Sequence, residues 1–277
     1  MWASEQRARR AGPMPKDRRR YRSDISDQEW KLVEPLLPGV ARTGRPCKIE
    51  LRQVINALRY LVRSGCEWRM LPNDFPRYQT AYYWVRRLMR RFLFRTIHDL
   101  ALMLDRMCEQ REVVPSAGIV DGQLVKAPGA RKRGYDAHRK ISGRKRHISV
   151  DTDGRLLAVH LTPADNADST GGQLILHALV KRWPWVNHLF GDAAYDRYAL
   201  LDKAAYLDFT IEVVRGLQGQ TGFQVPPRRW VVERTFAWMM RYRRLVRDYR
   251  YEQRLDVSTA MIYLALGSTL LHRIRFR

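Results

Sequence analysis

The spacing of apolar residues changes from helical to strand-like after Val114-Pro115. Before this point apolar residues recur every three or four positions, as they do in the segment 49–64, and this period predicts helices. Beyond it, two alternating segments flank Asp153-Gly154, a dipeptide typical of the turn of a β-hairpin. Three neighbouring strands followed by alternating helices and strands predict an α/β fold with a mixed sheet flanked by helices. A small all-α domain is expected to precede it.

The same patterns place the individual elements along the chain. Helices are expected at about 25–37, 49–64, 80–94, from Thr96 onwards, and at 169–182, 198–206, 230–245 and 256–274. Strands are expected at about 119–125, 144–151, 155–162, 186–190 and 209–214. Ser26 and Glu29 have the spacing of a capping box, which predicts where the first helix begins. The residues expected to face inward on the helix that Thr96 caps are Ile97, Leu100, Leu104 and Met107.

Basic residues outnumber acidic ones so strongly that the chain carries a formal net charge of +23. A charge of this size favours a polyanionic partner, most often nucleic acid. The alternatives are a merely soluble basic protein and a protein bound to an anionic membrane surface. The clustering of the charge argues against the first, and the large core argues against the second, because a basic amphipathic anchor needs no such core.

The cysteines and the N-terminus favour a cytoplasmic location. Cys47, Cys66 and Cys108 form no CxxC pair, which argues against a disulfide framework or a zinc site and favours a reducing compartment. Residues 1–22 are basic without an apolar centre, so they predict a disordered arm and not a secretory signal. No segment reaches the ~18 apolar residues that would span a bilayer.

The helix expected at 80–94 has an apolar face and a basic face, because side chains advance by about 100° per residue. The apolar face consists of Ala81, Val85, Leu88 and Phe92. The basic face consists of Arg86, Arg87, Arg90 and Arg91. A helix, a turn and a helix with a basic front resemble a helix-turn-helix reader of DNA, so residues 23–112 are expected to form a DNA-binding domain. A solvated charged face is the alternative.

A second basic cluster lies in the loop expected at 126–146. It consists of Lys126, Arg131, Lys132, Arg133, Arg139, Lys140, Arg144, Lys145 and Arg146. Because only Asp136 offsets these charges, the loop is expected to grip DNA phosphates, with binding that falls steeply with salt. His138 and His147 fit phosphate contacts or surface positions better than metal ligands.

Three acids point to a metal site. Asp121 lies inside a predicted strand, Asp192 directly follows one, and Glu233 stands near the start of a basic, aromatic helix. Cleavage of a phosphodiester needs an activated oxygen nucleophile, a stabilised leaving oxygen and neutralised phosphate charge, which two Mg²⁺ ions about 4 Å apart supply. Mg²⁺ prefers a few carboxylates and keeps its other positions for water and phosphate. The three acids therefore predict a divalent-metal site that cuts nucleic acid.

Each of these acids also has an ordinary structural explanation. Asp121 fits a turn, and Asp192 fits the cap of the helix that follows it. Glu233 fits an ion pair with Arg229 or Arg234. The acids better explained as solvated or capping residues are Asp151, Asp153, Asp165 and Asp168, whereas Asp196 is a second choice for a ligand.

Seven short motifs together resemble the bacterial insertion-sequence DDE transposases of family five. They are DISDQEW at 24–30, GRP at 44–46, GCEWRMLP at 65–72, VDGQLVK at 120–126, GRKRH at 143–147, DAAYD at 192–196 and RWVVERTFAW at 229–238. The last motif is the most specific, and the resemblance covers about residues 22–250. Around the glutamate the family has a tyrosine where this chain has Pro226, and a basic residue where it has Met240. Arg241, one position later, is expected to substitute.

The resemblance implies a ribonuclease H-like core at 113–277, with Asp121, Asp192 and Glu233 as catalytic and metal-binding triad. It implies Mg²⁺ as cofactor, replaceable by Mn²⁺, and hydrolysis at the ends of an element, followed by attack of the 3′ hydroxyls on target DNA. It implies double-stranded DNA as partner, at terminal inverted repeats and target, with at least a dimer on paired ends. The arginines expected to contact DNA here are Arg229, Arg234 and Arg241.

Two other functions remain open from the sequence. One is a catalytically silent DNA-binding remnant or regulator that recognises the same terminal repeats. The other is a structure-specific nuclease on the same fold. Retention of all three acids argues against the first, and the helix-turn-helix region argues against the second, because a nuclease need not recognise the ends of one element.

Overall fold

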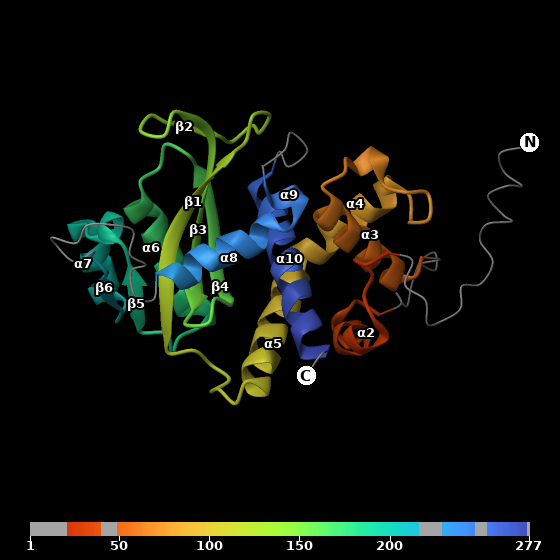
Figure 1. Ribbon diagram of the computed structural model, residues 1–277, viewed down its shortest axis with the longest axis horizontal. Helices are drawn as coiled ribbons and strands as arrows, with labels where there is room; N and C mark the ends of the chain where they lie inside the picture. The colour runs from red at the N-terminus through yellow and green to blue at the C-terminus, as the bar shows by residue number, and fades with distance from the viewer. Residues whose placement is uncertain (1–20, 40–48, 216–228, 247–253, 276–277) are drawn as a thin grey trace, which may run out of the picture.

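The computed structural model describes residues 21–39, 49–215, 229–246 and 254–275 of the chain. These residues form a curled sheet with its own helices, and a second group of helices beside it (Figure 1). Most of the predicted basic arm, the Gly-Arg-Pro loop at 44–46 and Pro226 lie outside the described residues.

The N-terminal helices agree closely with the predicted ranges. They are α2 (Asp27–Val33), η1 (Glu34–Leu36), α3 (Leu51–Ser64), η2 (Trp68–Met70), α4 (Tyr78–Arg90) and α5 (Leu93–Cys108). The predicted capping box is confirmed: the Ser26 hydroxyl accepts from the Glu29 backbone N–H at 3.2 Å, and the Glu29 carboxylate accepts from the Ser26 N–H at 2.8 Å. α3 ends at Gly65, whose φ of 71° is left-handed, as is usual after a helix.

Two predictions for α5 are wrong. The helix begins at Leu93 after Phe92, which has a left-handed φ of 55°, and Thr96 lies inside the first turn, where its hydroxyl donates to the Phe92 carbonyl. The predicted inward face is also displaced, since Leu100 is 39% and Met107 is 55% exposed. The buried face consists of Phe94, His98, Ala101, Leu102, Asp105 and Arg106. Three of these are polar, so the apolar period pointed to the wrong side of the helix.

The sheet has six strands, β1 (Ala117–Lys126), β2 (Gly134–Asp136), β3 (Ile141–Asp151), β4 (Leu156–Pro163), β5 (His188–Gly191) and β6 (Thr210–Val213). β1, β3 and β4 form an antiparallel meander, and β5 and β6 continue from β1 as parallel strands. β2 pairs with the first residues of β3, inside the segment expected to be a basic loop. The order β4-β3-β1-β5-β6, with this mixture of directions, confirms the predicted ribonuclease H-like sheet.

The helices of the second half are α6 (Asp168–Arg182), η3 (Ala193–Tyr195), α7 (Tyr198–Tyr206), α8 (Trp230–Met240), α9 (Arg243–Val246) and α10 (Leu255–Arg275). α6 packs against β1, β3 and β4, and α8 packs against β1 and β3. Figure 1 shows α8 in front of the strands and α6 behind them. The single helix predicted at 230–245 is interrupted after Met240, so α8 and α9 are separate.

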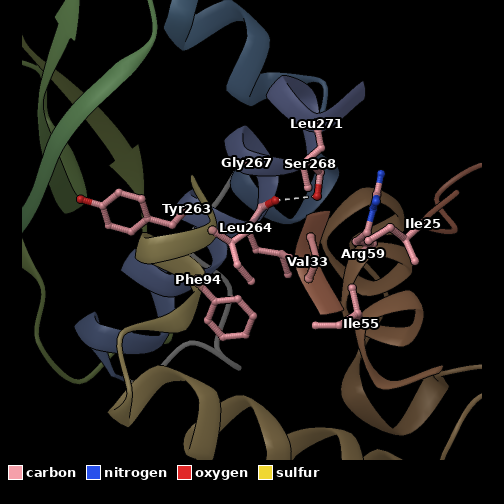
Figure 2. Close-up of a pocket in the computed structure, with 11 residues that line it drawn as sticks. Ile25, Val33, Ile55, Arg59, Phe94, Tyr263, Leu264, Gly267, Ser268 and Leu271 are labelled. Atoms are coloured by element: carbon pink, nitrogen blue, oxygen red, sulfur yellow. Dashed lines mark hydrogen bonds between the residues drawn. The ribbon is translucent and has the colours of Figure 1, made fainter. Parts of the chain in front are cut away.

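α10 joins the C-terminal end of the chain to the N-terminal helices. It packs mainly against α5 and also contacts α2, α3, α4, β4 and α8. In Figure 2, Leu264 and Leu271 of α10 face Val33 of α2 and Ile55 of α3 across a small apolar cavity. Residues 255–274 are long and apolar enough to cross a membrane, but 72% of that helical segment is buried inside the protein, as in a core helix. The predicted division of domains at residue 112 stays a prediction.

Candidate active site and nucleic-acid interface

The parallel pairing of β1 and β5 places Asp121, in the middle of β1, beside the end of β5, which Asp192 directly follows. Ile119 is paired with Phe190, and the same register continued by two residues sets Asp192 beside Asp121. In sheets of this kind, ligands bind just beyond the carboxyl ends of parallel strands. The strand register therefore explains why the first two acids of the predicted site, Asp121 and Asp192, lie close together.

Both aspartates are anchored by one oxygen each. Asp121 Oδ1 accepts from the Gly122 backbone N–H at 2.7 Å. Asp192 Oδ1 accepts from the Ala194 N–H at 2.9 Å and caps η3. The capping alternative for Asp192 is thus real, but it uses only one oxygen and leaves Oδ2 facing Arg229 at 3.6 Å.

Glu233 lies in the first turn of α8, exposed, on the helix that packs against β1. Its charge acts on Asp121: burial, together with the Asp192 and Glu233 charges, raises the pKa of the Asp121 carboxyl to about 6. The Gly122 N–H and the Arg229 guanidinium oppose that rise. Three carboxylates that repel one another, with one arginine as counter-charge, form a site that favours a cation.

The chemistry of these donors fits a divalent metal ion, because Mg²⁺ binds carboxylate oxygens and needs few of them from the protein. Among the described residues, no group of three or more His, Cys, Asp or Glu side chains is already arranged to hold a metal ion. Asp192 instead neighbours Arg229. The donor set is present, but its carboxylates are not yet gathered around one point.

Behind the aspartates lies Tyr195, a buried residue that the sequence reasoning did not select. A Cβ added at Gly172 or Gly191 would meet the Tyr195 side chain at 3.1 or 3.2 Å, so both glycines make room for it. Its hydroxyl is buried and has no hydrogen-bond partner among the residues that the structure describes. Burial raises its pKa well above the usual value, with further contributions from Asp121 and other nearby acids. In the sequence, Gly172 and Gly191 were the only hint that a large side chain is packed at this place.

His147 and Asp168 also lie next to β1, the strand that carries Asp121. A Cβ at Gly122 would meet Asp168 Oδ1 at 2.8 Å, so Asp168 approaches the backbone directly after Asp121. His147 is fully buried, and its Nε2 lies 2.9 Å from the Thr162 hydroxyl. Burial lowers the pKa of His147 to about 4, so its ring is neutral at pH 7. The expected phosphate contact or surface position for His147 is wrong.

Two of the arginines predicted to contact DNA are core residues. Arg144 is 0% and Arg146 is 1% exposed, although both belong to the basic segment 126–146 that was expected to grip phosphates; they lie where the predicted strand at 144–151 begins. Arg144 donates to the Lys132 carbonyl at 2.7 Å, and Arg146 donates to the Leu245 carbonyl at 2.7 Å. Because β3 is a central strand, these side chains enter the protein and do not reach phosphate. The prediction of DNA contact is wrong for both.

Lys145 and Arg234 are also engaged within the protein. Lys145 Nζ donates to the Asn166 carbonyl at 2.9 Å and lies 3.5 Å from Asp168. Arg234 donates to the Asp153 carbonyl at 2.8 Å. Its guanidinium also stacks between two rings, with Trp230 at 4.5 Å and Trp238 at 4.7 Å. Their predicted contacts with DNA stay proposals.

The basic face of α4 is present but uneven. Ala81, Val85 and Leu88 are buried as expected, whereas Phe92 lies beyond the helix and is 60% exposed. Arg87 is half-buried, with its guanidinium 5.0 Å from the Trp84 ring centre. Arg86 is also half-buried. The cations predicted to contact DNA that are exposed are Arg90, Arg91, Lys126, Arg131, Lys132, Arg133, Arg139, Lys140 and Arg241.

The strand order is that of a ribonuclease H-like fold, and Asp121 and Asp192 lie on its neighbouring strands β1 and β5. Residues 113–267 match the family model described as "Transposase DDE domain", and this match covers more than half of the chain. The chain therefore belongs to the DDE transposase family, a membership that implies use of a divalent metal ion. Residues 25–98 match a second model, described as "Putative transposase of IS4/5 family".

One curated relative from Burkholderia cepacia is described as "Putative transposase for insertion sequence element IS402". It is 33% identical over 141 residues, which are 47% of this chain and 62% of the relative. The match thus spans less than two thirds of that protein.

Among solved structures, the chain is similar to the "Mos1 transposase paired-end complex with left transposon end". That match has 14% identity, a TM-score of 0.24, and coverage of 62% of this chain and 60% of the other. A "pre-cleavage Mos1 transpososome" has 11% identity and a TM-score of 0.28, with coverage of 85% and 80%.

Proposed function

We propose that this protein is a DNA transposase that cuts the ends of an insertion sequence and joins the freed 3′ hydroxyls to target DNA. The observation that carries the proposal is the β1–β5 register, which places Asp121 and Asp192 side by side on neighbouring strands. The charge of Glu233 also acts on Asp121. Membership of the DDE family supports the same reaction class.

Asp121, Asp192 and Glu233 would hold the metal ions, with Mg²⁺ as the proposed cofactor and Mn²⁺ as its substitute. When bound, the ions supply an activated oxygen nucleophile, a stabilised leaving oxygen and neutralised phosphate charge. The chain itself contributes orientation: the Gly122 and Ala194 N–H groups each fix one aspartate oxygen. Arg229 lies 3.6 Å from Asp192 Oδ2 and serves as its counter-charge; a cation held by the acids would replace it in that role and would leave its guanidinium available to DNA phosphate.

The proposed DNA surface consists of the exposed cations near the site and on the helical region. Arg90 and Arg91 at the end of α4 would contact the terminal inverted repeats, and Lys126 and Arg241 would contact phosphates near the acids. Arg86, Arg87 and Arg229 are also proposed to contact DNA, but each is half-buried and therefore extends less far into solvent. Two paired ends call for at least a homodimer on DNA. The proposed location is the bacterial cytoplasm, where the chromosomal DNA lies.

The proposal is tested by incubating the protein with a plasmid that carries the inverted repeats flanking its gene, in Mg²⁺, Mn²⁺ or EDTA. Metal-dependent cuts at the repeat ends are expected. Asp192→Asn should abolish these cuts, because the negative charge of the carboxylate is needed to hold the metal ion. Repeat binding should stay within a few fold of wild type, because the fold does not depend on that charge. Tight repeat binding by the wild-type protein without cleavage under any metal would instead identify a catalytically silent regulator.

A further inference from the structure

The turn between β3 and β4, residues 151–155, is held by several hydrogen bonds and ion pairs, both within itself and to neighbouring helices. Within it, Asp151 Oδ1 accepts from the N–H groups of Asp153 at 2.9 Å and Arg155 at 2.8 Å. Gly154 has a φ of 85°, a conformation that other residues rarely adopt. This β3–β4 turn therefore has one well-defined shape.

On one side the β3–β4 turn is fastened to α5. Arg155 bonds to Asp105 at 2.7 Å and to Glu109 at 2.5 Å, and Arg106 bonds to Asp151 at 2.5 Å. Asp105 and Asp151 are fully buried. Burial alone would lower the pKa of Arg155, but the surrounding acids outweigh it and raise that pKa. Buried ion pairs of this kind tolerate only a narrow geometry, because breaking one leaves an uncompensated charge.

On its other side the same turn is fastened to α8. The Thr235 hydroxyl donates to the Gly154 carbonyl at 2.8 Å, and Arg234 donates to the Asp153 carbonyl at 2.8 Å. A Cβ added at Gly154 would lie 2.8 Å from the Thr235 hydroxyl, so turn and helix are in direct contact. Thr235 is fully buried. α8 thus rests on a turn whose position α5 determines.

Glu233 is the residue directly before Arg234 and lies in the same stretch of α8. Its side chain makes no hydrogen bond or ion pair with any residue that the structure describes, and it is exposed. The placement of its carboxylate therefore depends on the placement of the helix backbone. A small displacement of α8 would move Glu233 relative to Asp121 and Asp192, whose oxygens are held by their own strands and turns.

We propose that Gly154 and Thr235 are positioning residues for the third metal ligand: the contact of the β3–β4 turn with α8 sets where Glu233 stands relative to the two aspartates. The inference rests on the proposed metal-binding role of Glu233. It also gives the N-terminal helical region a physical link to the metal site, since α5 holds the turn that supports α8.

The experiment measures binding of Mn²⁺ to the full-length protein by electron paramagnetic resonance, without DNA. Thr235→Val keeps the shape of the side chain but removes the bond to Gly154, together with the longer contact of the hydroxyl with the Val231 carbonyl of its own helix at 3.1 Å. It is expected to weaken Mn²⁺ binding by about tenfold, as is typical when a group supporting a ligand is lost. Ser268→Ala is the matched control, because it removes a buried helical hydroxyl that, within the described part of the chain, bonds to the Leu264 carbonyl of its own helix alone (Figure 2). It should leave Mn²⁺ affinity unchanged.

A double-mutant cycle separates positioning from general destabilisation. If Thr235 acts through Glu233, Thr235→Val should have no further effect on Mn²⁺ affinity in a Glu233→Gln background. Gly154→Ala is a second variant with the same expected direction, and binding of repeat DNA in EDTA should be unaltered in all of them. Should Gly154→Ala not fold, Thr235→Val alone carries the test.

Each outcome has one meaning. Wild-type Mn²⁺ affinity in Thr235→Val, or an equal loss with and without Glu233, overturns the positioning role while leaving the triad intact. Unchanged Mn²⁺ affinity in Asp121→Asn and Glu233→Gln overturns the proposed metal site itself, and the positioning role with it. Loss in Thr235→Val that disappears in the Glu233→Gln background supports the inference.

Discussion

The arginines of β3 and those at the end of α4 come from equally basic stretches of sequence but differ completely in burial. Arg144 and Arg146 on β3 lie inside the protein and donate to backbone carbonyls. Arg90 and Arg91 lie exposed at the end of a helix whose opposite face is packed. A cluster of arginines therefore predicts DNA contact only where the element beneath it leaves the guanidinium groups in solvent.

The largest expected effect is on stability, from a substitution in β3. Arg146→Ala should lower the free energy of unfolding by about 2–4 kcal/mol, because it removes a buried side chain and leaves the Leu245 carbonyl without its donor. Urea denaturation measures this, with Arg90→Ala as an exposed control that should stay within about 0.5 kcal/mol of wild type. A variant of Arg146 with wild-type stability and lost DNA affinity would contradict the comparison.

The next effect is on DNA binding, from charge reversal on α4. Arg90→Glu with Arg91→Glu should weaken binding to the terminal repeats and reduce the slope of log affinity against log salt by about two units, if each arginine contacts one phosphate. Stability should change little, because both side chains are exposed. Affinity measured over a series of salt concentrations tests this, and an unchanged slope would remove α4 from the proposed DNA surface.

The smallest expected effect is on the stability of the metal-free protein, and it compares a buried acid, Asp121, with an exposed one, Glu233. Burial raises the folded-state pKa of Asp121 to about 6, so the folded state holds this proton more tightly than the unfolded chain does. Stability from this group is complete below the ordinary carboxyl pKa and is lost as pH rises towards 6. Asp121→Asn should therefore stabilise the metal-free protein by about 1–2 kcal/mol at pH 7, after allowance for partial solvent exposure.

Exposed Glu233 provides the contrast in the same measurement. Glu233→Gln should leave the metal-free stability close to wild type at pH 7 and at pH 5. Thermal unfolding in EDTA at the two pH values measures both variants. Equal behaviour of Asp121→Asn and Glu233→Gln would show that burial does not distinguish the two acids.

Local pattern determined most of the secondary structure. The helix at 198–206 has the predicted bounds, and the capping box at Ser26 and Glu29 has the predicted bonds. These succeed because caps, turn dipeptides and apolar periods act between residues close in sequence. The same local reasoning failed for α5, where Asp105 and Arg106 lie on the buried face, each paired with a charged residue of the β3–β4 turn. Polar residues paired across elements cannot be recognised from one segment.

The sequence by itself determined the class of sheet, all of its strands but β2, and the three acids proposed to hold metal, because each acid lies beside a strongly apolar segment or on a specific motif. Only the tertiary structure decided which basic residues face solvent, and that Arg144 and Arg146 do not. It alone placed the β3–β4 turn between α5 and α8. Burial and contact between distant segments depend on how the elements pack, and no single segment of the chain contains that information.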